Sequence, residues 1–247
     1  MGRHREGGEG LTPTSTATGS AVLGVDAFRG GWVGVRLAPG EPLRAYAAAG
    51  IAGLVSAALE QGGLAVVGID IPVGLAVAGP RRADLEAARL LGARRSSLFR
   101  TPVRAALEQE THAAANATQR ALTGEGVSAQ AYALRAKVLE VDAWRRTPGL
   151  PRVVEVHPET SYAVLAGRPA SFPKRTWAGL QERVALLAGV GIVLPADLGP
   201  AGAAAPDDVL DAAVAAWSAE RVRDGRARSL PDPPELLPDG TACAVWA

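Results

Sequence analysis

The pattern of apolar and polar positions predicts strands and helices in a recognisable order. Apolar runs at residues 21–26 and 32–37 enclose an RGG turn, which is typical of a β-hairpin, and residues 43–49 have the character of a third strand. Apolar side chains at helical spacing predict a helix from residue 51. A continuous apolar run at 64–70 is typical of a strand buried on both faces. The first part of the chain is therefore expected to run β-β-β-α-β.

The rest of the chain is predicted to be mainly helical. Three helical stretches follow Pro72, namely ADLEAARLLGA, RAALEQETHAAANATQRAL and SAQAYALRAKVLEVDAWRR. After a fifth strand at 152–158, helices are expected in ETSYAVLAG, TWAGLQERVALLAG and DDVLDAAVAAWSAERVRDG, the last ended by glycine. A proline-rich tail closes on a short apolar CAVW. These elements predict one α/β domain over 21–247, a mixed five-stranded sheet flanked by helices, with a helical insertion between the fourth and fifth strands.

Composition and charge limit the expected location and partners. Residues 1–20 are rich in glycine, serine and threonine and lack the apolar core of a secretory signal, so they are predicted to be a disordered tail. No apolar run approaches the ~20 residues of a membrane span, so no membrane partner is expected. The single cysteine, Cys243, cannot form an internal disulfide, which favours a cytoplasmic location. A net charge of +1 identifies no partner. The sequence does not fix the oligomeric state, and a homodimer stays open.

Two aspartates end apolar runs in the same way. Asp26 ends GVD and Asp70 ends GID. In open α/β sheets, functional groups gather at the carboxyl ends of strands. A single acid at such a place usually only caps a strand or begins a turn. Two acids on neighbouring strands repel each other unless a proton or a cation compensates them, which favours a bound cation.

The late helix adds further acids. Asp208 and Asp211 are three residues apart and share a helix face, as do Asp207 and Asp211 at a spacing of four. The helix dipole accounts for acids in the first turn, such as Asp207 and Asp208. Asp211 lies in the second turn among apolar residues, and an acid in that setting indicates a partner charge.

Other ionisable residues have roles that the sequence leaves open. Glu155 is flanked by valines in the strand at 152–158, so it could face either solvent or the acidic cluster. His157 could be a ligand or a base, although a histidine at a strand-to-helix turn is more often a structural hydrogen-bonding residue. Glu140 and Asp142 are expected on the solvent-exposed face of a helix.

A set of carboxylates fits hard divalent cations better than other cofactors. Mg²⁺ takes oxygen ligands and keeps several waters, so it needs few protein carboxylates. Two such ions ~3.5–4 Å apart can activate water and stabilise the leaving oxygen of a phosphodiester. The sequence lacks a zinc-ligand pattern. It also lacks a P-loop, a GxGxxG dinucleotide motif and a GxSxG nucleophile motif.

A basic stretch, RRSSLFRTPVR, occupies residues 94–104. Arginine side chains and hydroxyl groups are frequent phosphate contacts, and the stretch offers both. Its candidates for binding the substrate are Arg94, Arg95, Ser96, Ser97 and Arg104. The alternative is a solvated arginine-rich loop in an arginine-rich protein, which is about as common.

Six separated blocks together resemble a known family. They are GVDAFRGGWVGV, VVGIDIPVGL, LGARRSSLFRTPVR, VVEVHPETSY, PKRTWAGLQER and DDVLDAAVAAWSA, in this order, and the resemblance covers about residues 21–247. They are similar to the uncharacterised bacterial and archaeal family of predicted ribonuclease-H-like nucleases, domain-of-unknown-function family 429.

The resemblance implies a ribonuclease-H-like fold in which acids bind two Mg²⁺ or Mn²⁺ ions. Asp26 matches the acid of the first strand and Asp70 resembles that of the fourth. Asp208 and Asp211 resemble the paired helix acids of Holliday-junction resolvases. Glu155 belongs to the family's own EVHPE block and is a further candidate ligand. Arg29, His157 and Lys174 also lie in matched blocks and are candidates for binding the substrate.

Three hypotheses from different classes follow. The leading one is a metal-dependent nuclease that hydrolyses phosphodiester bonds of DNA or RNA, with the arginines of 94–104 positioning the backbone. The second is an actin-like phosphotransferase, because a Gly-rich hairpin follows Asp26, but such enzymes normally need a second related domain. The third is a non-catalytic protein that binds nucleic acid or protein and keeps the fold.

Overall fold

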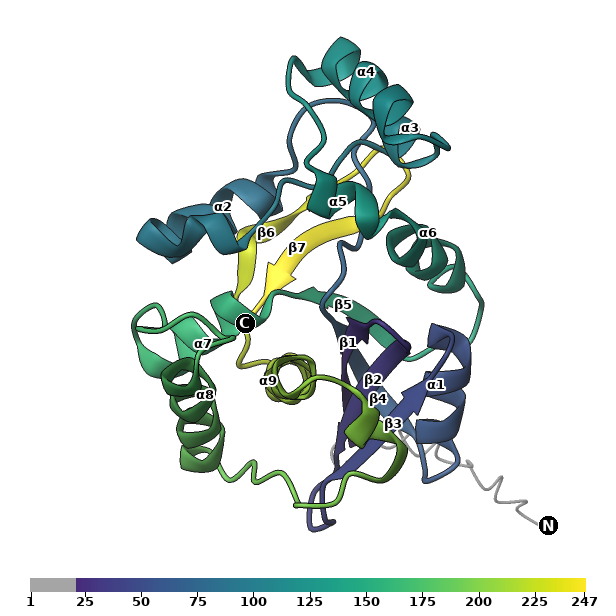
Figure 1. Ribbon diagram of the computed structural model, residues 1–247. Coiled ribbons are helices and arrows are strands. Elements are labelled where there is room, and N and C mark those ends of the chain that lie inside the picture. The colour runs from purple at the N-terminus through teal and green to yellow at the C-terminus, as the bar shows by residue number, and fades with distance from the viewer. Residues whose placement is uncertain (1–20) are drawn as a thin grey trace, which may run out of the picture.

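A mixed seven-stranded sheet lies at the centre of the computed structural model, which describes residues 21–247 (Figure 1). The disordered tail predicted for residues 1–20 lies outside the described residues. The strands are β1 (Ala21–Phe28), β2 (Gly31–Leu37), β3 (Arg44–Ala48), β4 (Leu64–Ile69), β5 (Arg152–Val156), β6 (Ser229–Leu236) and β7 (Ala242–Trp246). Their order is β3-β2-β1-β4-β5-β7-β6. The inner strands β1, β4, β5 and β7 run parallel, whereas β2, β3 and β6 pair antiparallel with their neighbours.

Helices cover both faces of this sheet. They are α1 (Ile51–Leu59), α2 (Arg82–Leu91), α3 (Arg104–Leu107), α4 (His112–Thr123), α5 (Ala129–Ala133), α6 (Arg135–Trp144), α7 (Pro158–Ala166), α8 (Trp177–Gly189) and α9 (Pro206–Arg223), with short 3₁₀ helices η1 (Gly92–Ser97) and η2 (Gly199–Ala203). Helices α1 and α6 pack on one face, and α7, α8 and α9 pack on the other (Figure 1). Each helix in the described part of the chain is too short or too polar to span a membrane.

The mixed sheet flanked by helices confirms the predicted α/β class, but the predicted count of five strands is wrong. The two extra strands, β6 and β7, come from the segment that the sequence indicated to be a proline-rich tail. Strand β6 carries Pro231, Pro233 and Pro234, which cannot donate ladder hydrogen bonds and so conceal the strand pattern. It lies at the edge of the sheet, where prolines are tolerated.

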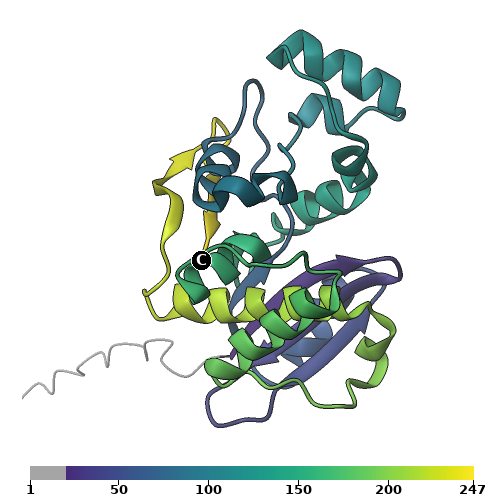
Figure 2. The same ribbon diagram turned by 60° about the vertical axis from the view of Figure 1, so that its left-hand side comes forward.

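The predicted helical insertion between β4 and β5 is present, but two of its three predicted helices are divided. The second predicted helix separates into α3 and α4, because the Thr111 side chain accepts a hydrogen bond from Ala114 N and begins a new helix. The third separates into α5 and α6 around Leu134. The insertion stands above the carboxyl ends of the strands, as Figure 2 shows in blue and teal.

Helix α9 packs unusually close to the sheet because two glycines face it. A Cβ atom on Gly24 of β1 would lie 2.0 Å from Ala216 N, and one on Gly68 of β4 would lie 2.8 Å from Ala215 O. Each glycine stands two residues before an aspartate: Asp26 in the last part of β1, which continues to Phe28, and Asp70 directly after β4. Small residues on both sides therefore bring the helix backbone directly against β1 and β4, and its first turns reach the strand ends.

Candidate metal centre

Three aspartates from three elements converge at one edge of the sheet. Strands β1 and β4 are parallel with Val25 opposite Ile69, and Asp70 N donates a hydrogen bond to Val25 O at 2.9 Å. Asp26 and Asp70 are therefore neighbours at the carboxyl ends of their strands. Asp211 joins them from the second turn of α9, and one carboxylate oxygen from each of the three lies within 4.8 Å of the others.

Burial and mutual repulsion make this cluster costly to ionise. Asp211 is only 1% exposed. Burial raises the pKa of Asp26 well above its usual value, and the charges of Asp70 and Asp211 add to the effect. Burial and the charge of Asp211 do the same to the pKa of Asp70. Burial raises the pKa of Asp211 to about 6, although Lys174 opposes the shift. The cluster therefore favours a proton or a cation.

The oxygens of Asp211 have different surroundings. Oδ2 accepts a hydrogen bond from Lys174 Nζ at 2.5 Å, while Oδ1 is buried without a hydrogen-bond partner in the described residues. A hard cation such as Mg²⁺ or Mn²⁺ would supply the missing partner of this buried oxygen, and the two neighbouring carboxylates could bind the same ion. The residues present thus fit a divalent metal.

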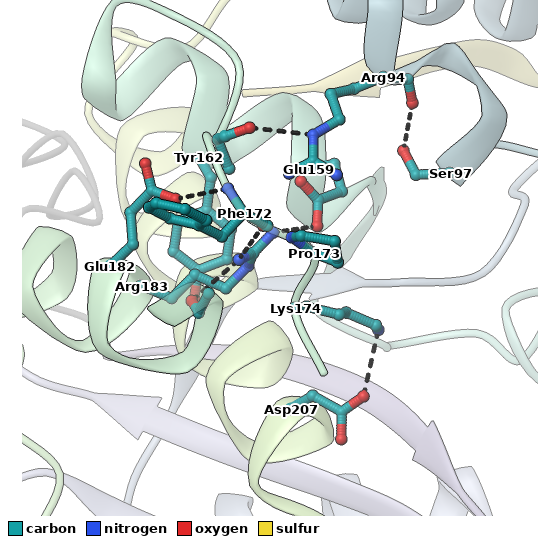
Figure 3. Close-up of polar contacts among 12 residues, drawn as sticks. Arg94, Ser97, Glu159, Tyr162, Phe172, Pro173, Lys174, Glu182, Arg183 and Asp207 are labelled. Carbon is teal, nitrogen blue, oxygen red and sulfur yellow. Dashed lines mark hydrogen bonds and ion pairs between the residues drawn. The ribbon is translucent and has the colours of Figure 1, made fainter. Parts of the chain in front are cut away.

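Lys174 brings a positive charge to this cluster from the loop between α7 and α8. Its Nζ also lies 3.9 Å from Asp207 Oδ2 in the first turn of α9, toward which the side chain extends in Figure 3. Burial alone would lower the pKa of Lys174, but the charge and hydrogen bond of Asp211, with the charges of Asp70 and Asp26, raise it. Lys174 is therefore an ammonium ion at neutral pH.

The cluster opens into a cavity of about 720 Å³ between the sheet and the helical insertion. Asp208 lines it together with the three converging aspartates, outside their closest group. Burial and the charge of Asp207 raise the pKa of Asp208. Arg94, Ser96 and Ser97 of η1 line the same cavity. The acidic groups thus share one cavity with an arginine and two serines.

Glu155 points inward, which answers the question that the sequence left open. Its carboxylate accepts two hydrogen bonds from the buried Arg81 guanidinium, at 2.7 and 2.8 Å, and a third from Val73 N at 2.7 Å. Burial raises the pKa of Glu155, and Arg81 opposes the shift. Glu155 lines the cavity, but these donors occupy its oxygens and it lies outside the three-aspartate group.

Arg81 and Asp84 are cavity residues that the sequence analysis missed. Asp84 accepts hydrogen bonds from Arg81 Nη2 and, at 2.8 Å, from Thr101 N, so it links α2 to the segment after η1. The Arg81 contact with Glu155 spans 74 positions in the sequence. No local pattern could have indicated a partner that far away.

His157 also faces the cavity. Its Nδ1 is buried without a hydrogen-bond partner in the described residues. Burial lowers the pKa of His157 to about 4, although Glu159 opposes the shift, so the imidazole is neutral at pH 7. Its ring can accept or donate a hydrogen bond there without adding charge.

The predicted arginines separate into two groups. Arg94 lines the cavity; its Nε donates to Ala170 O at 3.0 Å (Figure 3), and its Nη2 is buried without a partner in the described residues. Arg95 and Arg29 are exposed and lie outside the cavity lining. Arg104 is also outside it, because its guanidinium pairs with Asp142 at 2.8 Å.

Two acids predicted to be solvated have structural partners instead. Glu140 accepts hydrogen bonds from Trp32 Nε1 at 3.1 Å and Ile51 N at 2.7 Å, so it joins α6 to β2 and the start of α1. Asp142 is buried and pairs with Arg104 and Arg145. The prediction of a solvent-exposed face was wrong for both, because Trp32, Ile51 and Arg104 reach these acids from distant segments.

The fold and the cavity define a mixed α/β protein with a candidate metal centre at the edge of its sheet. A family model described as a protein of unknown function (DUF429) matches residues 24–236, and the chain belongs to that family. The match runs from just before Asp26 into β6 and so includes the whole acidic cluster. No curated protein and no solved structure matches this chain.

Proposed function

We propose that this protein is a metal-dependent nuclease that hydrolyses phosphodiester bonds of nucleic acid in the cavity above Asp26 and Asp70. The observation that carries the proposal is the convergence of three aspartate oxygens within 4.8 Å, with Asp211 Oδ1 buried and unpartnered beside them. Asp26, Asp70 and Asp211 would hold Mg²⁺ or Mn²⁺, with Asp208 within the same cavity. The bound metal would supply Lewis-acid stabilisation of the phosphate and a more acidic attacking water.

A ribonuclease-H-like fold is part of the same proposal. The first five strands lie in the order β3-β2-β1-β4-β5, an antiparallel meander followed by two parallel strands, and α9 packs across β1 and β4. This arrangement, with acids on the first strand, the fourth strand and the last helix, supports that assignment. Strands β6 and β7 extend the sheet beyond those five.

The chain's own residues would bind and orient the substrate. Arg94 offers an unpartnered Nη2 and Ser96 offers a hydroxyl group, both on the side of the cavity formed by the insertion. The Ser97 hydroxyl donates to Arg94 O at 2.8 Å and would have to rotate to reach a phosphate. These groups suit the non-bridging oxygens of a phosphate. The neutral His157 imidazole can hold a water or a phosphate oxygen by a hydrogen bond. Arg81 and Asp84 would keep the cavity wall in position.

Exposed aromatic residues in a segment that also contributes to the cavity lining favour a nucleic-acid substrate. Phe172 and Trp177 are 49% and 75% exposed and stand in the segment that contains the cavity residues Lys174 and Arg175. Bases stack on such side chains without regard to sequence, while cations contact the backbone. A small phosphoester would need no aromatic surface outside the cavity.

The proposal predicts metal-dependent cleavage of DNA or RNA. Labelled single-stranded and duplex substrates should be cut in Mg²⁺ or Mn²⁺ and spared in EDTA. Asp70→Asn should lower the rate at least about a hundredfold, since even residues that only support metal ligands commonly cost 10–100-fold. Glu60→Gln, at an exposed acid of α1's C-terminal end, is the matched control. Turnover of nucleoside triphosphates without polymer cleavage would favour a phosphotransferase, and binding without turnover a non-catalytic protein.

A separate prediction distinguishes the two neighbouring arginines. Arg94→Ala should weaken polymer binding and reduce the slope of log K against log salt by roughly one unit, because one phosphate contact and its released counterions are lost. Arg95→Ala is the matched control, because Arg95 is exposed and outside the cavity lining. Labelled DNA and RNA should be titrated over a salt series. Equal slopes for Arg94→Ala and the wild type would assign Arg94 to structure.

A further inference from the structure

Lys174 binds a carboxylate oxygen of Asp211 that could otherwise hold a second metal ion. Its Nζ lies 2.5 Å from Asp211 Oδ2, and its charge acts on Asp70 and Asp26 as well. The other oxygen of Asp211 remains unpartnered. One side of this carboxylate is thus already bound to a cation from the chain itself, and the other side is free.

Electrostatic repulsion opposes a second divalent ion on that oxygen. Mg²⁺ binds carboxylate oxygens at about 2.0–2.1 Å, so an ion on Asp211 Oδ2 would lie within about 5 Å of Nζ in a poorly screened environment. The charges of one divalent ion and one ammonium together neutralise the three negative charges of the converging carboxylates. A second divalent ion would give the centre a net positive charge before any substrate binds.

We propose that the Lys174 ammonium takes the place of a second divalent ion, so that the centre binds one metal ion per chain. This inference rests on the proposed metal centre. Lys174 is 33% exposed on its side chain and lines the cavity, so the protons that do not contact Asp211 can donate to a phosphate oxygen. The chain would then contribute a fixed cation beside the metal, positioned to neutralise the phosphate during attack.

The test is the number of Mn²⁺ ions bound, measured by calorimetry and by the electron paramagnetic resonance signal of free Mn²⁺. The wild type should bind one ion. Lys174→Met keeps the length of the side chain but removes the charge, and it should bind two, because both oxygens of Asp211 become free. Lys174→Arg keeps a cation and should bind one. Lys137→Met, at a lysine that pairs with Glu140, is the matched control and should bind one.

Each outcome decides between the alternatives. Two ions on the wild type would overturn this inference and leave the proposed nuclease intact, whereas no ion on the wild type would overturn both. One ion on both the wild type and Lys174→Met would also overturn it, because Lys174 would then not determine the stoichiometry. If Lys174→Met fails to fold, Lys174→Gln takes its place, and one ion on both the wild type and Lys174→Gln would overturn the inference in the same way.

Discussion

Asp26→Asn is expected to raise the thermal stability of the metal-free protein at neutral pH and to remove its response to metal. In the wild type, saturating Mn²⁺ should raise the free energy of unfolding by about 2.7 kcal/mol at a hundredfold excess over Kd, or roughly 5–10 °C in Tm. The variant relieves the repulsion among the converging carboxylates of Asp26, Asp70 and Asp211. It also removes one of the three oxygens that would hold the ion.

The pH dependence of the metal-free protein follows from the same cluster. The folded-state pKa of Asp211, about 6, exceeds the ordinary 3.8, so the folded chain binds more protons than the unfolded chain between these values. Stability is therefore greatest below pH ~4 for this group and is lost as the pH rises through 6, by about 3 kcal/mol at most. Metal should flatten this decline, and Asp26→Asn should reduce it.

Melting curves from pH 4 to 8, with EDTA or Mn²⁺, would measure both effects. Glu60→Gln removes a charge from an exposed acid and should leave the wild-type pattern unchanged. A wild-type protein whose Tm is indifferent to millimolar Mn²⁺ would count heavily against a metal centre.

Gly24→Ala should be among the most destabilising single substitutions in the chain. The new Cβ would lie 2.0 Å from Ala216 N and 2.1 Å from Ala212 O, which are backbone atoms of α9 and cannot rotate away. Overpacking usually costs about 1–3 kcal/mol, and a clash with backbone belongs at or above the upper end. The helix must shift away from β1, so Asp211 should also move from Asp26 and Mn²⁺ binding should weaken.

Two other strand glycines provide graded controls. In Gly68→Ala the new Cβ would lie 2.8 Å from Ala215 O, so the loss of stability should be intermediate. In Gly34→Ala of β2 the new Cβ would lie 3.1 and 3.2 Å from side-chain atoms of Leu54 and Leu23, which can move, so the loss of stability should be small. Chemical denaturation would rank the three. A Gly24→Ala protein within 1 kcal/mol of Gly34→Ala would show that α9 does not depend on this close approach.

The sequence determined the elements that have a local pattern. Apolar runs predicted β1, β2, β3, β4 and β5, and helical spacing with a terminal glycine predicted α9, because burial of one face or both leaves a regular trace in neighbouring residues. Asp26 and Asp70 stood out for the same reason, each as an acid that interrupts an apolar run at a strand end.

Tertiary structure alone decided which of these residues meet. Gly24 and Gly68 allow α9 to bring Asp211 to the strand ends, Lys174 arrives from a separate loop, and Arg81 holds Glu155 away from the three-aspartate group. Strands β6 and β7 could likewise be recognised only from their position in the sheet beside β5, because the prolines of β6 hide the local strand pattern. Each of these contacts joins residues far apart in the chain. Packing distance and charge determine such partners, and the periodic pattern of apolar residues in the sequence does not encode either.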